Sequence, residues 1–141
     1  ASSNYTVKYA SGRKLPGTYT VTVTMKGSYT GSKTLTFAIR GKQMTVSKLT
    51  ALSKGFKATW KKQSYITGYQ VQYSTSSKFT AKTTKHYTIN KYTTTYKTVT
   101  KLKAKTKYYV RVRSYKTTKI GGKNYNVYSA WSKAKAVTTK K

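Results

Sequence analysis

The stretch LKAKTKYYVRVRSY, residues 102–115, alternates two kinds of residue with a period of two. Every second position from Leu102 to Val112 suits a hydrophobic core, whereas the positions between them hold cations and tyrosines. Such alternation predicts a β-strand with one buried face, because successive side chains of a strand point to opposite faces. It leaves open what the cationic face contacts, since the chain has no Asp or Glu to pair with it.

The charge of the whole chain is one-sided. Its 141 residues include 30 Lys and Arg and no acidic residue, which gives a formal net charge of +30, whereas an ordinary composition would supply about 17 acidic residues. Such a charge attracts polyanions, among them nucleic acid, anionic lipid surfaces, acidic polysaccharides and cell-wall phosphate polymers. The alternative is that the lysines are solvated and only keep the chain soluble.

Further runs of β-branched and aromatic residues alternate in the same way, and no segment holds apolar residues at helical spacing over three turns. The chain is therefore expected to be all-β. Gly121 and Gly122 indicate a tight hairpin that extends two strands. The pattern breaks near residues 40–43, where we place a boundary between residues 1–40 and residues 42–141. The main alternating runs are Tyr19–Met25, Leu35–Ile39, Phe56–Trp60 and Tyr69–Tyr73.

From Gln43 onward the chain resembles a fibronectin type III domain. The family pattern Leu-x-Pro-x-Thr-x-Tyr-x-Val-x-Val is matched from Leu102 to Val112, with Ala104 in place of the proline. Trp60 matches the core tryptophan of the family, GYQVQYS (residues 68–74) its third strand, and SAWSKAKAVTT (residues 129–139) its last strand. The resemblance implies an immunoglobulin-like β-sandwich. It also implies that Tyr108 is a corner tyrosine whose hydroxyl bonds a nearby backbone group.

Residues 1–40 are similar to the end of an immunoglobulin-like repeat, through GTYTVTVTMKGSYTGSKTLTFAI (residues 17–39). The segment is long enough for about three strands, which is too few for a sandwich of their own. One apolar face, with Val21, Leu35 and Phe37, must therefore be covered by another element. Three candidates are the fibronectin-like part, a second copy of the chain, and a part of the parent protein.

The composition excludes most catalytic and metal sites. General acid–base chemistry usually needs a poised carboxylate, histidine or cysteine, and the chain has one histidine, His86, and no carboxylate side chain or cysteine. We expect His86 to lie on an exposed edge without a chemical role. The composition alone leaves a Ser–Lys dyad open, but no Gly-x-Ser-x-Gly turn is present. We therefore expect no enzyme, no metal site and no cofactor, and no run is apolar enough to insert into a membrane.

One surface remains as a candidate ligand face. The resemblance places the strands at 69–73 and 108–115 side by side, and alternation then directs polar and aromatic side chains outward together. Arginine can bind phosphate or carboxylate through two hydrogen bonds, and tyrosine rings stack on sugars or bases. The alternative is a solvated face on which cation–π contacts replace ion pairs. The predicted face consists of Gln70, Gln72, Tyr109, Arg111, Arg113 and Tyr115.

The lysine-rich sequence resembles domains of Gram-positive bacterial surface proteins, and this resemblance implies a non-catalytic module located outside the cell, at its surface or wall. As a spacer or adhesion unit it would contact neighbouring repeats of its parent protein, anionic wall polymers or acidic glycans, and would bind nucleic acid only non-specifically. One alternative is a dedicated polyanion-binding protein whose partner is nucleic acid or an acidic polysaccharide. Another is an engineered scaffold from which the acidic residues were removed.

We predict that salt stabilises the folded chain. The cations repel each other more strongly in the compact state than in the expanded chain, and salt screens this repulsion. The midpoint of thermal unfolding should therefore rise between about 20 mM and about 500 mM sodium chloride. A midpoint that stays constant or falls would contradict the argument.

Overall fold

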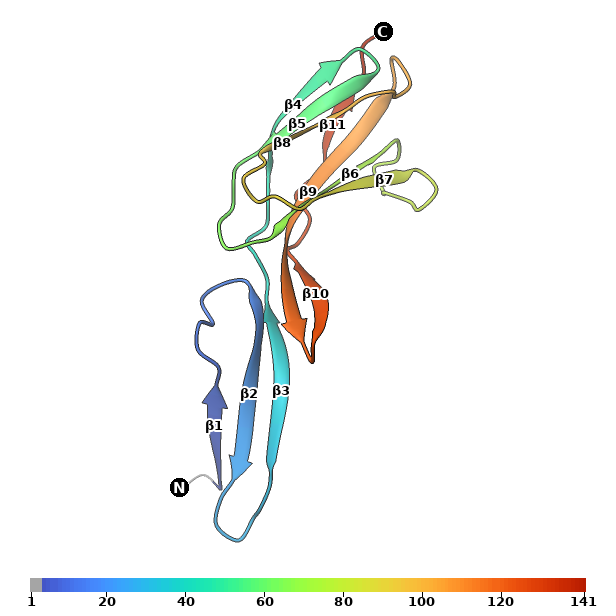
Figure 1. The fold of residues 1–141 in the computed structure, drawn as a ribbon. Helices are drawn as coiled ribbons and strands as arrows, with labels where there is room; N and C mark the ends of the chain where they lie inside the picture. Colours follow the sequence, from blue (N-terminus) through green and yellow to red (C-terminus); the bar gives the residue numbers. More distant parts are fainter. Residues whose placement is uncertain (1–3) are drawn as a thin grey trace.

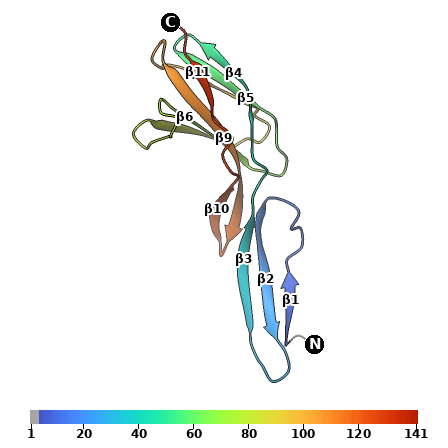
Figure 2. The ribbon, with the colours of Figure 1, turned by 180° about the vertical axis from the view of Figure 1, so that it is seen from behind.

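The computed structural model describes residues 4–141, and within them it contains eleven β-strands and no helix. The all-β prediction is therefore confirmed. Figure 1 shows two bodies arranged end to end: an N-terminal sheet near the first residues, and a sandwich that ends at the C-terminus. The view from behind in Figure 2 shows the same elongated arrangement.

The N-terminal sheet is antiparallel, with the strand order β1-β2-β3. In its register Val21 of the middle strand lies opposite Tyr9 on one side and Leu35 on the other, so the three side chains share one face. Threonines occupy most of the other face because they fill the intervening positions. The strands of this sheet are β1 (Tyr5–Tyr9), β2 (Gly17–Met25) and β3 (Ser32–Ile39).

The sandwich consists of two antiparallel sheets. The smaller sheet has the order β4-β5-β8, and the larger has the order β10-β9-β6-β7, with β11 also paired to β9. The strands of the smaller sheet are β4 (Val46–Leu52), β5 (Gly55–Trp60) and β8 (Tyr96–Val99). Those of the larger sheet are β6 (Gly68–Ser74), β7 (Thr84–Ile89), β9 (Lys107–Ile120), β10 (Lys123–Tyr128) and β11 (Lys135–Thr138).

The core lies between these two sheets and follows the predicted alternation. Trp60 of β5 packs against Tyr69 of β6, with their ring centroids 5.4 Å apart. Val110 and Val112 of β9 are fully buried opposite Tyr73 and Val71 of β6. The strand predicted from residues 102–115 therefore has the expected buried face, although it begins at Lys107 and extends to Ile120.

Beyond the sandwich, β9 and β10 continue as a hairpin that reaches the N-terminal sheet (Figure 1). The turn is formed by Gly121 and Gly122, whose φ angles of 55° and 80° suit glycine. The predicted hairpin extension is thus confirmed. Its tip, at Lys119–Gly121, and the threonine face of β2 and β3 together line a hollow of about 300 Å³.

The connection between the two bodies, residues 40–45, is fixed against the sandwich. Met44 is buried in the core cluster, with 7% of its surface exposed. The side chain of Gln63 donates a hydrogen bond to the Lys42 carbonyl, and that of Gln43 donates one to the Trp131 carbonyl. These contacts hold residues 42–44 of the connection against the sandwich.

The hydrogen bond to backbone that was expected of the Tyr108 hydroxyl is made by the Tyr69 hydroxyl instead. Tyr108 is buried and packs against Phe56 and Tyr73, but no hydrogen bond of its hydroxyl to backbone is found within residues 4–141. The Tyr69 hydroxyl accepts a hydrogen bond from the Gln63 backbone N–H and donates one to the Tyr92 carbonyl. Burial raises the pKa of Tyr69, and the hydrogen bond from Gln63 opposes part of this effect.

We predict that Tyr69→Phe lowers the free energy of unfolding by about 1–3 kcal/mol, because it leaves a backbone N–H and a carbonyl without their partner. Tyr108→Phe is the matched control, and it should cost well under about 1 kcal/mol because it removes no backbone hydrogen bond. Urea unfolding of the two variants measures the difference. Equal losses of unfolding free energy in the two variants would show that the Tyr69 hydroxyl does not stabilise the loops that it bonds.

Candidate functional site

The register between β6 and β9 pairs each arginine of the candidate face with a glutamine. Arg111 lies opposite Gln72, and Arg113 lies opposite Gln70. Arg111 donates to the Gln72 side-chain oxygen from Nε at 2.9 Å and from Nη2 at 2.7 Å. Arg113 donates to the Gln70 oxygen in the same way, at 2.9 and 2.6 Å. An amide oxygen thus takes the position that a carboxylate usually holds in such a fork.

Aromatic rings stack on both guanidinium groups. The Cζ atom of Arg111 lies 4.0 Å from the ring centroid of Phe79 and 4.7 Å from that of Trp131. The Cζ atom of Arg113 lies 4.2 Å from Trp131 and 3.7 Å from Tyr128. These five side chains form a series that we call the arginine ladder. Cation–π attraction of this kind contributes about 0.5–2 kcal/mol per contact, depending on desolvation.

Two serines on either side of Trp131 bring its ring to this face. The backbone N–H groups of Ser129 and Ser132 donate to the carbonyls of Ser114 and Val112 on β9. The hydroxyls of the two serines accept hydrogen bonds from the backbone N–H groups of the same β9 residues, both at 3.0 Å. The segment between β10 and β11 therefore stays bonded to β9 where no regular strand pairing occurs, and Trp131 is held over the arginines.

Burial affects the charge of both arginines. It lowers the pKa of Arg111, and it lowers the pKa of Arg113, which neighbouring Tyr128 raises and neighbouring Arg111 lowers further. Guanidinium groups remain protonated despite such shifts, because their ordinary pKa is far above neutral. The ladder therefore holds two cations close together without a carboxylate, and ring faces and amide oxygens supply the compensation.

The structure gathers most of the predicted face but changes its character. Gln70, Gln72, Arg111 and Arg113 lie together as expected, and Tyr109 lies on the same side, with its ring 5.5 Å from the Lys107 amine. Their polar groups bond to each other, so the face is a packed surface rather than an open set of donors. The sequence reasoning missed Phe79, Tyr128 and Trp131, which come from outside the two predicted strands.

Tyr115 was expected to be free for contact, and this is wrong. Only 3% of its surface is exposed. It lies opposite Gly68, where an added Cβ would come within 3.1 Å of the Tyr115 hydroxyl. Because Gly68 has no side chain, the ring extends across it, and the hydroxyl donates to the Asn90 side-chain oxygen. Burial raises the pKa of Tyr115, and Tyr128 adds to the increase.

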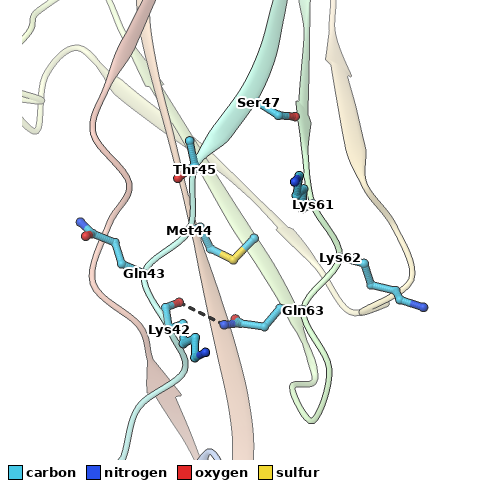
Figure 3. Close-up of a pocket in the computed structure, with 8 residues that line it drawn as sticks. All are labelled: Lys42, Gln43, Met44, Thr45, Ser47, Lys61, Lys62 and Gln63. Carbon is cyan, nitrogen blue, oxygen red and sulfur yellow. Dashed lines mark hydrogen bonds between the residues drawn. The ribbon is translucent and has the colours of Figure 1, made fainter.

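A concave basic surface lies elsewhere, beside the connection between the two bodies. Figure 3 shows this pocket between residues 42–47 and the end of β5. Its volume is about 500 Å³. Lys42, Lys61 and Lys62 are exposed around it, and the buried Met44 provides an apolar wall. No carboxylate side chain exists in the chain to neutralise these amines.

Comparison with known proteins follows the same division of the chain. The family model described as "Fibronectin type III domain" matches residues 41–129, which is more than half of the chain. The chain belongs to the fibronectin type III family. Such domains are generally non-catalytic modules of multidomain proteins, and nothing in the described residues indicates an enzyme. Within residues 4–141, no group of potential metal ligands and no helix able to span a membrane is present.

Solved structures of multidomain proteins share this fold. The FN1-FN3 domains of chicken CNTN1 have a TM-score of 0.57 and 16% sequence identity over 90% of this chain. Domains A168-A170 of titin have a TM-score of 0.51 and 19% identity over 99% of this chain. The chain covers 42% of the first structure and 50% of the second. No curated protein matches the sequence.

We predict that Trp131→Ala lowers the free energy of unfolding of this fibronectin type III chain by about 2–4 kcal/mol, because the ring contacts both arginines and covers the sheet. Tyr29→Ala is the control, since Tyr29 is 59% exposed in the loop between β2 and β3. It should change stability by about 0.5 kcal/mol or less. Similar losses for both variants would mean that the ladder contributes little to stability.

Proposed function

We propose that this chain is a non-catalytic, extracellular module of a bacterial surface protein that separates neighbouring modules and holds anionic wall polymers or acidic glycans on its lysines. The observation that carries the proposal is the complete absence of acidic residues beside 30 Lys and Arg. A lysine cluster on such a surface has no carboxylate side chain of its own chain to pair with, so its counter-charge comes from the surroundings, and a polyanion can supply it by displacing small anions. The family supports the modular role, since its domains are generally structural units of longer proteins.

The spacer role is supported by the connection between the two bodies. Met44 is buried, Gln43 bonds to the Trp131 carbonyl, and Gln63 bonds to the Lys42 carbonyl, so residues 42–44 are fixed on the sandwich. The β9–β10 hairpin adds a second contact with the N-terminal sheet. The two parts of the chain, residues 1–40 and 42–141, would thus form a semi-rigid unit. Such a unit keeps neighbouring modules at a fixed separation better than a flexible linker does.

Anion binding is assigned to the lysines of the pocket rather than to the arginine ladder. Arg111 and Arg113 direct Nε and Nη2 at glutamine oxygens and stack on rings, which reduces what they offer to a ligand. Lys42, Lys61 and Lys62 surround a hollow that a polymer segment could enter. Their amines attract phosphate, sulfate or carboxylate without the geometric demands of an arginine fork.

The test measures binding of heparin and of a purified cell-wall phosphate polymer by three paired variants. Lys61→Ser with Lys62→Ser removes two charges at the pocket, and Lys140→Ser with Lys141→Ser removes two charges from the C-terminal end. Arg111→Lys with Arg113→Lys keeps the charge but removes the forks. The pocket pair should lose roughly three- to tenfold more affinity than the terminal pair, because Lys61 and Lys62 line the pocket, and affinity should fall with rising salt.

The arginine-to-lysine pair should retain the affinity of the unaltered chain after its folding is verified. A larger loss in that pair than in the pocket pair would move the site to the ladder. Equal losses for the pocket and terminal pairs would show that binding follows total charge alone. A salt-independent preference for nucleic acid over both polymers would support a dedicated nucleic-acid-binding protein instead.

A further inference from the structure

The N-terminal sheet exposes one apolar face. In its register Val7 pairs with Val23, and Tyr19 pairs with Phe37, so their side chains lie on the same side as those of Val21 and Leu35. Val7 is 42% exposed and Leu35 is 52% exposed. The lengths of β2 and β3, nine and eight residues, make this face about 28 Å long. The three paired strands make it about 14 Å wide. Contiguous apolar patches of this size on a soluble surface usually mark an interface.

The fibronectin type III part of this chain does not cover this face. Thr18, Thr20 and Thr36 line the hollow that the hairpin tip closes, and their side chains lie on the opposite side of the sheet. The hairpin thus packs on the threonine side, while the apolar side stays exposed. One of the three candidates for covering it is therefore excluded. A sheet with one apolar face is stable when a second layer packs on it.

Charge decides against a second copy of the chain as that layer. Two copies would bring together two net charges of +30 with no carboxylate side chain between them. The face itself has cations at its margins. The Arg13 guanidinium lies 4.6 Å from the ring centroid of Tyr9, and Lys33 lies opposite Val23 in the register, which places its side chain on the apolar side. In a face-to-face dimer, these groups would have no opposite charge to pair with.

We infer that this face docks against a β-sheet layer of different sequence that alternates apolar residues and carries Asp or Glu where it meets Arg13 and Lys33. Its apolar side chains would interdigitate with those of β2 and β3 at the usual spacing of packed sheets, about 10 Å. Its carboxylates would provide the opposite charge that this chain lacks. The inference goes beyond the proposed polymer binding, since it concerns another surface and another class of partner.

The test uses two cyclised β-hairpin peptides that share one face of alternating valines. One carries Glu at the strand ends, and the other carries Lys at the same positions. Fluorescence anisotropy of the labelled peptides with the full chain, in about 100 mM salt, should show at least about tenfold tighter binding of the Glu hairpin, because only it complements the face. Equal binding of the two hairpins, or binding of neither, would overturn the inference.

Variants locate the binding on the sheet. Leu35→Thr with Phe37→Thr should weaken binding of the Glu hairpin by at least about tenfold, because it removes the apolar contact. The control, Thr22→Ser with Thr24→Ser on the opposite side, should bind as the unaltered chain does. Because the first variant removes packing within the sheet, Arg13→Glu with Lys33→Glu provides an independent test. It leaves the apolar face intact and should reverse the preference toward the Lys hairpin.

Sedimentation of the full chain tests whether a second copy of the chain covers the apolar face. At about 100 mM salt the chain should remain monomeric at the concentrations used for binding. A dimer that disappears in the Leu35→Thr, Phe37→Thr variant would show that a second copy covers the face, and would overturn the inference. A preference for the Glu hairpin that persists unchanged in the Arg13→Glu, Lys33→Glu variant would overturn it as well.

Discussion

The absence of any carboxylate side chain is the constraint on which the rest of the structure depends. A buried or half-buried cation needs compensation, and here it must come from amide oxygens and aromatic rings. Arg111 and Arg113 obtain it from two glutamines on β6 and from three rings. Lysines use the same solution nearer to solvent, for the amines of Lys57 and Lys97 lie 4.3 and 4.2 Å from tyrosine centroids.

The same constraint separates two kinds of basic surface. On the outer face of the large sheet, Arg111 and Arg113 keep their charge, but glutamine oxygens and aromatic rings of the same molecule compensate it. Around the pocket at the connection, the amines of Lys42, Lys61 and Lys62 have no hydrogen bond or ring contact within residues 4–141. High net charge alone therefore does not locate a binding surface. The distribution of rings and amides decides which cations are available to a ligand.

Alternation along the chain predicted the strands β2, β3, β5, β6 and β9 and the buried face of the sandwich strands among them. The pattern around Tyr108, Val110 and Val112 correctly placed the core side of β9, and the family resemblance correctly placed β9 beside β6. What it could not predict was exposure, which depends on neighbours far away in the sequence. Tyr115 has the parity of an outward residue but lies over Gly68, and Trp131 reaches the ladder from a segment without regular strand geometry.

The corner tyrosine illustrates a further limit of sequence reasoning. Tyr69 and Tyr108 are both buried tyrosines on the core side of their strands. The family resemblance implied that Tyr108 would make the hydrogen bond to backbone. The hydroxyl of Tyr69 meets backbone groups because the loops at Gln63 and Tyr92 pass its ring tip. The pKa of Tyr73 is raised as well, to about 12, by burial and by the neighbouring Tyr87. Loop courses, which alternation does not encode, distinguish these tyrosines.

The arginine ladder also determines how the molecule responds to acid. In most proteins, carboxylates hold the guanidinium groups. As the pH falls, the carboxylates become protonated and lose their attraction for the guanidinium groups, which lowers the stability. Glutamine oxygens and aromatic rings have no proton to gain over that range. The contacts of Arg111 and Arg113 are therefore the same at about pH 2 as at about pH 7. A surface held together in this way keeps its form in acidic surroundings where ion-paired relatives would loosen.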